Sequence, residues 1–321
     1  MVFQEFLQKI KETIKQQMPN YYKVEIIKIT KNNNQILEGI VISNKSDWIG
    51  QNIYLNTYYQ DYLQGRETDS IVNEIINLHI QAYGNISSEP IEILKVGQMD
   101  NKVTYRLVNY EMNSERLKTM PHKEICDLAK IYYIIVESDS NGTASIAITN
   151  DLIKQWDYSI EKLDKIAEMN TPHLFPPTIK TMNQILFEML KSNSEESYKH
   201  SSHEAIEMFE NLNQVFYNPL PKSNESEMYV LSNINNLNGA SAMIYPNVLH
   251  DFAVSHQSNL YILPSSIHES ILIPINQRLT KESLRQMVIE VNQTQVAPEE
   301  VLSNEVYYYD YKNDEVSIAK E

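Results

Sequence analysis

A short polar segment, SSIHE at residues 265–269, brings together the residue types that hydrolytic enzymes use. Ser265 and Ser266 could act as nucleophiles, His268 could act as a general base, and Glu269 supplies a carboxylate. If extended backbone continues through the segment, Ser266 and His268 point to the same side, because side chains alternate along a strand. The spacing therefore supports the hypothesis of a hydrolase-like enzyme that uses Ser266, or Ser265, with His268.

The same segment also fits other roles. In this geometry Glu269 faces the opposite side, so a catalytic triad needs a carboxylate from elsewhere, such as Asp251 or Glu282. The chain contains no GxSxG motif. Serine and histidine in a connection between strands commonly bond to the local backbone. The alternatives are therefore a structural hairpin connection, which the pattern favours, and a loop that recognises a ligand.

Two other groups of residues could also carry chemistry. His200, His203 and Glu204 fall within one helical turn, but their spacing differs from HExxH and zinc needs further ligands. Their polar neighbours favour a solvated helix start, so we predict no metal site. His122 and Cys126 have i, i+4 spacing, and a buried cysteine in a helix is the favoured interpretation. We also predict no cofactor, because the chain has seven glycines and no GxGxxG or P-loop motif.

The composition excludes several classes of protein and of binding partner. With 321 residues, 42% of them hydrophobic, the chain is long enough for two domains or one large one. A net charge of −15 and scattered basic residues argue against partners such as nucleic acid or anionic lipid. No apolar run approaches the roughly 20 residues of a membrane span, and we see no signal peptide. A single cysteine excludes an internal disulfide. From these features together we expect a cytoplasmic protein without a membrane partner.

The SSIHE segment is predicted to join two strands that lead into a helix. Apolar runs at 260–263 and 271–275 predict a hairpin. Thr280 can cap the next helix, and Leu279 and Leu284 have the spacing of a hydrophobic staple. A similar pattern occurs earlier, where a hairpin around Asn141-Gly142 precedes a helix that Ser159 can cap. The similarity is one of pattern and leaves open whether the two units are a true repeat.

The rest of the chain adds further helices and hairpins. Asn238-Gly239 is predicted to turn into a strand at 240–245, and residues 178–190 are predicted to be helical. We predict an α+β fold with mainly antiparallel sheets built from hairpins and with amphipathic helices packed on them. The expected regions, which could also form one cooperative unit, are an N-terminal α+β region at 1–120, a middle hairpin-plus-helices region at 121–217, a linker at 218–227 and a C-terminal α+β region at 228–321.

Several segments resemble one protein family. They include Met228-YVLSN, Asn238-GASAMIYP and Leu260-YILPSSIHESILIP, with Gly142-TASIAITNDLIKQW and Asn170-TPHLFPP in the middle of the chain. On these segments the chain resembles the uncharacterised bacterial family called domain of unknown function 5688, common in Firmicutes. The resemblance covers most of residues 20–312 and implies a bacterial cytoplasmic context and one cooperative architecture. It implies no activity, because the family has no established catalytic residues.

Taken together, the residues favour a cytoplasmic, non-enzymatic interaction or regulatory protein. Its partner, a protein or a small molecule, is not specified by the sequence. The alternative is the hydrolase-like enzyme that uses Ser266 or Ser265 with His268. The orientation of the Ser266 and His268 side chains, and a concave pocket beside them, would distinguish the two hypotheses.

Overall fold

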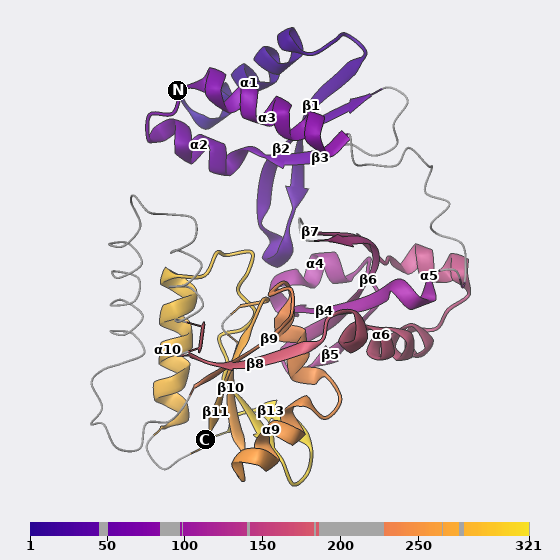
Figure 1. Ribbon diagram of the computed structural model, residues 1–321, viewed down its shortest axis with the longest axis vertical. Helices are drawn as coiled ribbons and strands as arrows, with labels where there is room; N and C mark the ends of the chain where they lie inside the picture. Colours follow the sequence, from indigo (N-terminus) through magenta and orange to yellow (C-terminus); the bar gives the residue numbers. More distant parts are fainter. Residues whose placement is uncertain are drawn as a thin grey trace. The chain divides into compact units, whose positions relative to one another are not determined.

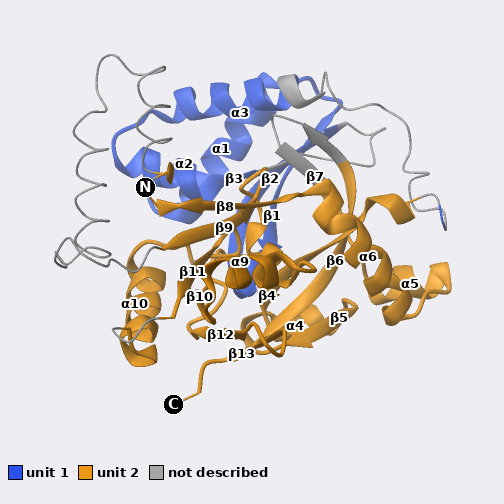
Figure 2. Ribbon diagram, turned by 60° about the horizontal axis from the view of Figure 1, so that its bottom comes forward, with its two compact units in different colours: residues 1–98 blue, residues 99–321 orange. Residues whose placement is uncertain are grey.

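The computed structural model describes residues 1–44, 51–83, 97, 99–139, 142–182, 184–185, 228–264, 266–275 and 279–320. The chain divides into two compact units, Met1–Gln98 and Met99–Glu321, which Figure 2 colours separately. The three sheets that the described residues form (Figure 1) are antiparallel, so the predicted α+β class is confirmed. In the part of the chain that the structure describes, no helix is long and apolar enough to cross a membrane.

The first unit packs helices on a three-stranded sheet of order β1-β2-β3. Its elements are α1 (Phe3–Gln17), β1 (Tyr22–Thr30), η1 (Asn32–Asn34), β2 (Ile36–Asn44), β3 (Gln51–Tyr54), α2 (Leu55–Leu63) and α3 (Thr68–Tyr83). The predicted apolar stripe of α1 is buried, and Phe6, Ile10 and Ile14 are fully inaccessible to solvent. These side chains share a core with Ile71 and Ile75 of α3. The N-terminal helix therefore packs on its own unit.

A four-stranded sheet begins the second unit. Its strands are β4 (Val103–Asn109), β5 (His122–Ile125), β6 (Leu128–Asp139) and β7 (Gly142–Ala147), and both β5 and β7 pair with the long β6. Short helices accompany the sheet: η3 (Asp100–Lys102), η4 (Glu111–Asn113), α4 (Ser114–Leu117) and α5 (Asn150–Trp156). Helix α6 (Ile160–Leu174) packs against β4, and the Ser159 hydroxyl caps it as predicted by accepting the N–H of Lys162.

A six-stranded sheet completes the second unit. Its strand order is β13-β12-β10-β11-β9-β8. The elements are β8 (Pro177–Thr181), β9 (Tyr229–Asn233), η5 (Gly239–Ile244), α9 (Val248–His256), β10 (Leu260–Leu263), β11 (Ser270–Pro274), α10 (Lys281–Thr294), β12 (Tyr307–Asp310) and β13 (Glu315–Ile318). The predicted β10–β11 hairpin and the Thr280 cap of α10 are both confirmed, because Thr280 accepts the N–H of Ser283.

One apolar core joins the two sheets of the second unit. It contains Tyr105 and Tyr132 from the four-stranded sheet and Leu231, Leu260 and Tyr307 from the six-stranded sheet. The expected boundary between residues 120 and 121 lies inside the four-stranded sheet, because β4 pairs with β6. The expected middle and C-terminal regions also meet directly, because β8 pairs with β9. The expected linker at 218–227 lies outside the described residues.

The free edge of β4 is covered by side chains. Thr171 of α6 accepts the N–H of Tyr105 at 3.0 Å, and Ser241 of η5 accepts the N–H of Leu107 at 3.3 Å. The Asn170 amide donates to the carbonyl of Val103. An uncovered edge strand would present unpaired backbone groups. These side-chain bonds therefore take the place of a further strand and hold α6 and η5 against the sheet.

Three sequence predictions of local structure are wrong. Residues 122–125 form a strand, and Cys126 is an exposed turn residue with φ 56°, so it is not a buried cysteine in a helix. Residues 177–181 form the strand β8, so the predicted helix at 178–190 does not begin there. After Asn238-Gly239 the chain forms the 3-10 helix η5 instead of a strand. Tertiary contacts override the local pattern in each case.

Candidate functional site

The SSIHE segment forms the connection between β10 and β11. Ser265 lies outside the described residues, whereas Ser266 is 9% exposed and His268 and Glu269 are partly buried. The N–H of Ser266 donates to the carbonyl of Glu269 at 3.3 Å, which closes the turn. The apolar β strands on either side fix the two ends of this connection, which we call the SIHE loop (residues 266–269).

The Ser266 hydroxyl bonds to the backbone of its own loop. Its Oγ accepts the N–H of His268 at 3.0 Å. This is the local side-chain-to-backbone bond that serine commonly forms in turns. The structure therefore brings Ser266 and His268 together through the His268 backbone, and the contact does not use the imidazole.

The imidazole of His268 is held by two other segments. Its Nδ1 accepts the backbone N–H of Asn238 at 3.1 Å. Nε2 lies 3.4 Å from Oε1 of Glu300. A neutral ring that accepts at Nδ1 carries its proton on Nε2. Neither nitrogen of this tautomer has a lone pair free to take the Ser266 proton.

Glu300 is the carboxylate that sequence reasoning missed. Its carbonyl also accepts the N–H of Ile267 at 2.8 Å, so the segment around residue 300 holds the SIHE loop twice. Asp251 lies 3.5 Å from the ring of His250, and Glu282 is exposed in the first turn of α10. Glu300 lies 32 residues from His268 and belongs to no motif. The sequence therefore contains no local signal that links the two residues.

Strand β9 and helix η5 also hold the SIHE loop. Ser232 donates its hydroxyl to the carbonyl of His268 at 2.8 Å, and the N–H of Ala240 donates to the carbonyl of Ile267 at 3.2 Å. A Cβ on Gly239 would lie 2.1 Å from Ser232 Oγ and 2.6 Å from the His268 carbonyl oxygen. Glycine is therefore required for this close approach.

The carboxyl group of Glu269 in the SIHE loop has a raised pKa. Burial raises the pKa of its carboxyl above the ordinary value, and the neighbouring His268 offsets part of this rise. Burial disfavours the charged form of any carboxyl group. Glu269 therefore costs folding free energy whenever it is ionised.

The possible metal ligands His200, His203 and Glu204 lie outside the described residues. Within the described ranges, no three His, Cys, Asp or Glu side chains are arranged to hold a metal ion. The prediction that no metal site exists at residues 200–204 stays a prediction.

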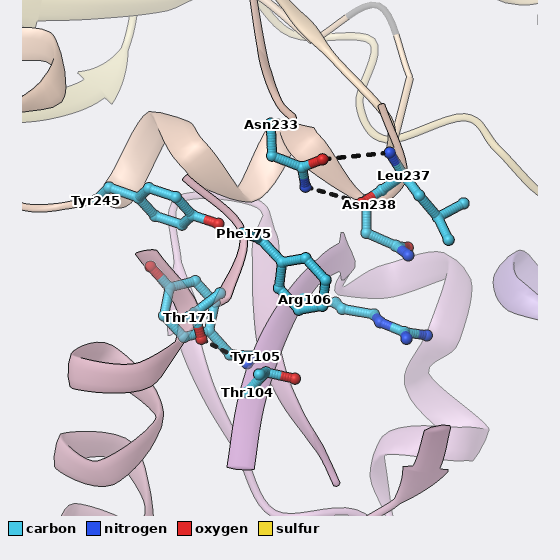
Figure 3. A pocket seen from close by; sticks show the side chains of 9 residues that line it. All are labelled: Thr104, Tyr105, Arg106, Thr171, Phe175, Asn233, Leu237, Asn238 and Tyr245. Atoms are coloured by element: carbon cyan, nitrogen blue, oxygen red, sulfur yellow. Dashed lines mark hydrogen bonds between the residues drawn. The ribbon is translucent and has the colours of Figure 1, made fainter. Parts of the chain in front are cut away.

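A small cavity lies beside the β9–η5 connection, at the free edge of β4 (Figure 3). Asn233 holds this connection by donating to the carbonyl of Leu237 and accepting its N–H. The cavity has a volume of about 10 Å³. This volume suits about one water molecule, so the cavity is too small for a substrate.

A larger groove lies at the end of α10. Its volume is about 650 Å³, within the range of ordinary ligand sites. The described residues that line it carry no charged side chain; they are Met112, Asn292, Gln293, Thr294, Gln295, Val296, Ala297, Pro298, Val301 and Asn304. The wall at Pro298 and Val301 flanks Glu300, which holds the SIHE loop. We call this feature the α10 groove.

The fold and these contacts define an α+β protein of antiparallel sheets, with a polar loop held by hydrogen bonds from distant segments. The chain belongs to the family of unknown function (DUF5688), whose model matches residues 3–311. The family resemblance seen in the sequence is therefore confirmed. Comparisons with curated proteins and with solved structures gave no match.

Proposed function

We propose that this protein acts by binding a protein partner in the bacterial cytoplasm and does not catalyse a reaction. The observation that carries the proposal is the use of both His268 ring nitrogens and the Ser266 hydroxyl in contacts within the fold. A serine nucleophile needs a base with a free lone pair directed at its hydroxyl. The single cysteine supports a reducing compartment.

The α10 groove is the proposed binding surface. Among the described residues that line it, four have carboxamide side chains, which both donate and accept hydrogen bonds, and the others are mostly apolar. Such a lining complements an uncharged peptide segment, whose backbone offers the same two kinds of group. Glu300 links the groove wall to the SIHE loop, so the loop acts as the support of the binding surface.

A substitution in the groove tests the binding proposal. Met112 is 37% exposed and lines the groove, whereas Met169 is 78% exposed on α6 and does not line it. Met112→Lys places a charge against the uncharged lining. We expect a partner captured by cross-linking from the native host to be lost with Met112→Lys and retained with Met169→Lys. Equal capture by both variants would contradict the groove as the binding surface.

The hydrolase hypothesis has a separate test. A serine-reactive phosphonate probe should label neither the wild type nor Ser266→Ala above the background of unfolded protein. Labelling of the wild type that is lost in Ser266→Ala would contradict the non-enzymatic proposal. A parallel Ser265→Ala variant examines the other serine, which lies outside the described residues.

A further inference from the structure

The four-stranded sheet has a face that points away from α6. Lys130 and Tyr132 of β6 bond to Asp164 of α6, so they mark the face that α6 covers. Side chains alternate along a strand, so Tyr133 lies on the opposite face. Arg106 of β4 also lies there, because it pairs in register with Ile131. Figure 3 shows the Arg106 side chain extending away from Tyr105, its neighbour on β4.

Two arginines converge on Tyr133 on this face. The Arg106 guanidinium lies over the Tyr133 ring, 4.1 Å from its centroid, and donates to Ser145 Oγ of β7 at 2.8 Å. Arg116 of α4 donates to the Tyr133 hydroxyl at 2.6 Å. Each guanidinium has five N–H donors, and one of them is used in these bonds. Both side chains are partly exposed.

Neither arginine has a counter-ion within the described part of the chain. No carboxylate of a described residue lies within 4.0 Å of Arg106 or Arg116, whereas Arg66 pairs with Asp61 and Glu74, and Arg285 pairs with Glu305. Burial lowers the pKa of Arg106; Tyr133 opposes this effect, and the nearby Arg116 cation adds to it. Two neighbouring cations without an anion are unfavourable, and they are unexpected in a chain with a net charge of −15.

Thr104 is a further polar residue of this face. It pairs in register with Tyr133 and so lies on the same face as Arg106. Its side chain is 1% exposed, and its hydroxyl has no hydrogen-bond partner in the described structure. Buried hydroxyl groups are usually bonded. Thr104 and Arg106 both line the small cavity at the edge of β4, which has room for about one water molecule, so a water molecule there can bond to this hydroxyl.

We propose that Arg106 and Arg116, with the Ser145 hydroxyl beside Arg106, bind the oxyanion group of a small molecule, a phosphate or a carboxylate. The planar guanidinium fork binds both groups with two parallel hydrogen bonds, and this geometry favours arginine over lysine. The site lies on the four-stranded sheet and is separate from the α10 groove. The inference therefore does not rest on the proposed function.

Titration of the arginine side-chain N–H signals by NMR tests the site, with inorganic phosphate in one arm and acetate in the other. Ionic strength is held constant with sodium chloride, because long-range effects of salt are screened. We expect saturable shifts of the Arg106 and Arg116 signals with one or both anions. The arm with the higher affinity identifies the oxyanion. The absence of a saturable shift in both arms would overturn the inference.

Arginine variants make the test specific to the site. Arg106→Gln and Arg116→Gln should each weaken binding by about tenfold or more, since each removes a charge-assisted bond. Arg285→Gln is the matched control, because Arg285 already pairs with Glu305. Arg116→Lys keeps the charge and loses the fork, so we expect a smaller loss. Near-ultraviolet circular dichroism verifies folding of each variant. Unchanged affinity in folded Arg106→Gln and Arg116→Gln would also overturn the inference.

Discussion

The backbone N–H of Asn238 donates a hydrogen bond to Nδ1 of His268 over 3.1 Å. This bond joins the β9–η5 connection to the SIHE loop, 30 residues further along the chain. Because it occupies the imidazole lone pair, it makes His268 a support for the backbone. The proposed binding role, in place of catalysis, depends on this bond.

Removal of the imidazole should therefore weaken the fold. His268→Ala leaves the N–H of Asn238 without its acceptor and removes the contact with Glu300. We expect a loss of about 1–3 kcal/mol in the free energy of unfolding, as for a buried donor that loses its partner. Urea denaturation measures this loss. His250→Ala is the control, because the His250 side chain is 42% exposed, and its effect should be much smaller.

A methyl group at residue 239 should be poorly tolerated. In Gly239→Ala the new Cβ would lie 2.6 Å from the His268 carbonyl oxygen and 2.7 Å from the Asn233 nitrogen, both backbone atoms. We expect a loss of about 2–3 kcal/mol in stability, measured by denaturation, because the backbone has to shift. The double variant with Ser232→Ala should not recover this loss, since both backbone contacts remain. Recovery would show that only the Ser232 hydroxyl limits the space.

Neutralisation of Glu269 should stabilise the protein at neutral pH. Burial raises the pKa of this carboxyl in the folded state. The folded protein therefore binds the proton more tightly than the unfolded chain, and stability falls as pH rises from the unfolded pKa through the folded one. Glu269→Gln should raise the melting temperature at pH 7 by about 2 °C and have less effect at low pH. The exposed Glu12→Gln provides the comparison, and an equal response of the two variants would contradict the burial argument.

Asp164 should stabilise the folded protein at neutral pH and lose this effect in acid, which is the opposite of the pH dependence of Glu269. Lys130 donates to its Oδ1 at 2.8 Å and Lys123 to its Oδ2 at 2.6 Å, and Tyr132 also donates to it. Burial by itself raises the pKa of Asp164. The interactions with Lys123, Lys130 and Tyr132 together lower this pKa by a larger amount, so the net shift is downward. The stability that follows is present above the unfolded pKa and is lost as pH falls through the folded one.

Asp164→Asn tests this contribution. Lys130 is 4% exposed, and among the described residues it would keep Glu168 alone as an ionic partner. We expect a loss of about 3 kcal/mol at pH 7, as for a buried ion pair that loses one member. The difference from the wild type should shrink in acid. Asp151→Asn, whose side chain is 89% exposed, is the control and should leave the pH profile unchanged.

Local signals in the sequence were sufficient to predict much of the fold. Thr280 and Ser159 cap their helices as expected, because a cap involves residues only three positions apart. The apolar runs of β10 and β11 likewise identified the hairpin. Cys126 adopts a positive φ in a tight turn, and nothing in its local pattern distinguishes this conformation from a helix.

Less of the candidate site could be predicted from the sequence. The SIHE loop was found because its polar residues are adjacent, but its partners Asn238 and Glu300 are 30 and 32 residues away from His268. Arg106 and Arg116 meet only because β6 places Tyr133 between them. Long-range contacts of this kind have no periodic signal, so pattern analysis could not identify them.

The protonation of the His268 ring tests the central claim most directly. Two-dimensional ¹H–¹⁵N NMR of the imidazole nitrogens at pH 7 identifies which nitrogen carries the proton and whether Nδ1 is coupled to the Asn238 amide. We predict a proton on Nε2 and a scalar coupling between the Asn238 N–H and Nδ1. A proton on Nδ1, or an Nδ1 without coupling to Asn238, would contradict the structural role of His268 and restore it as a candidate base for Ser266.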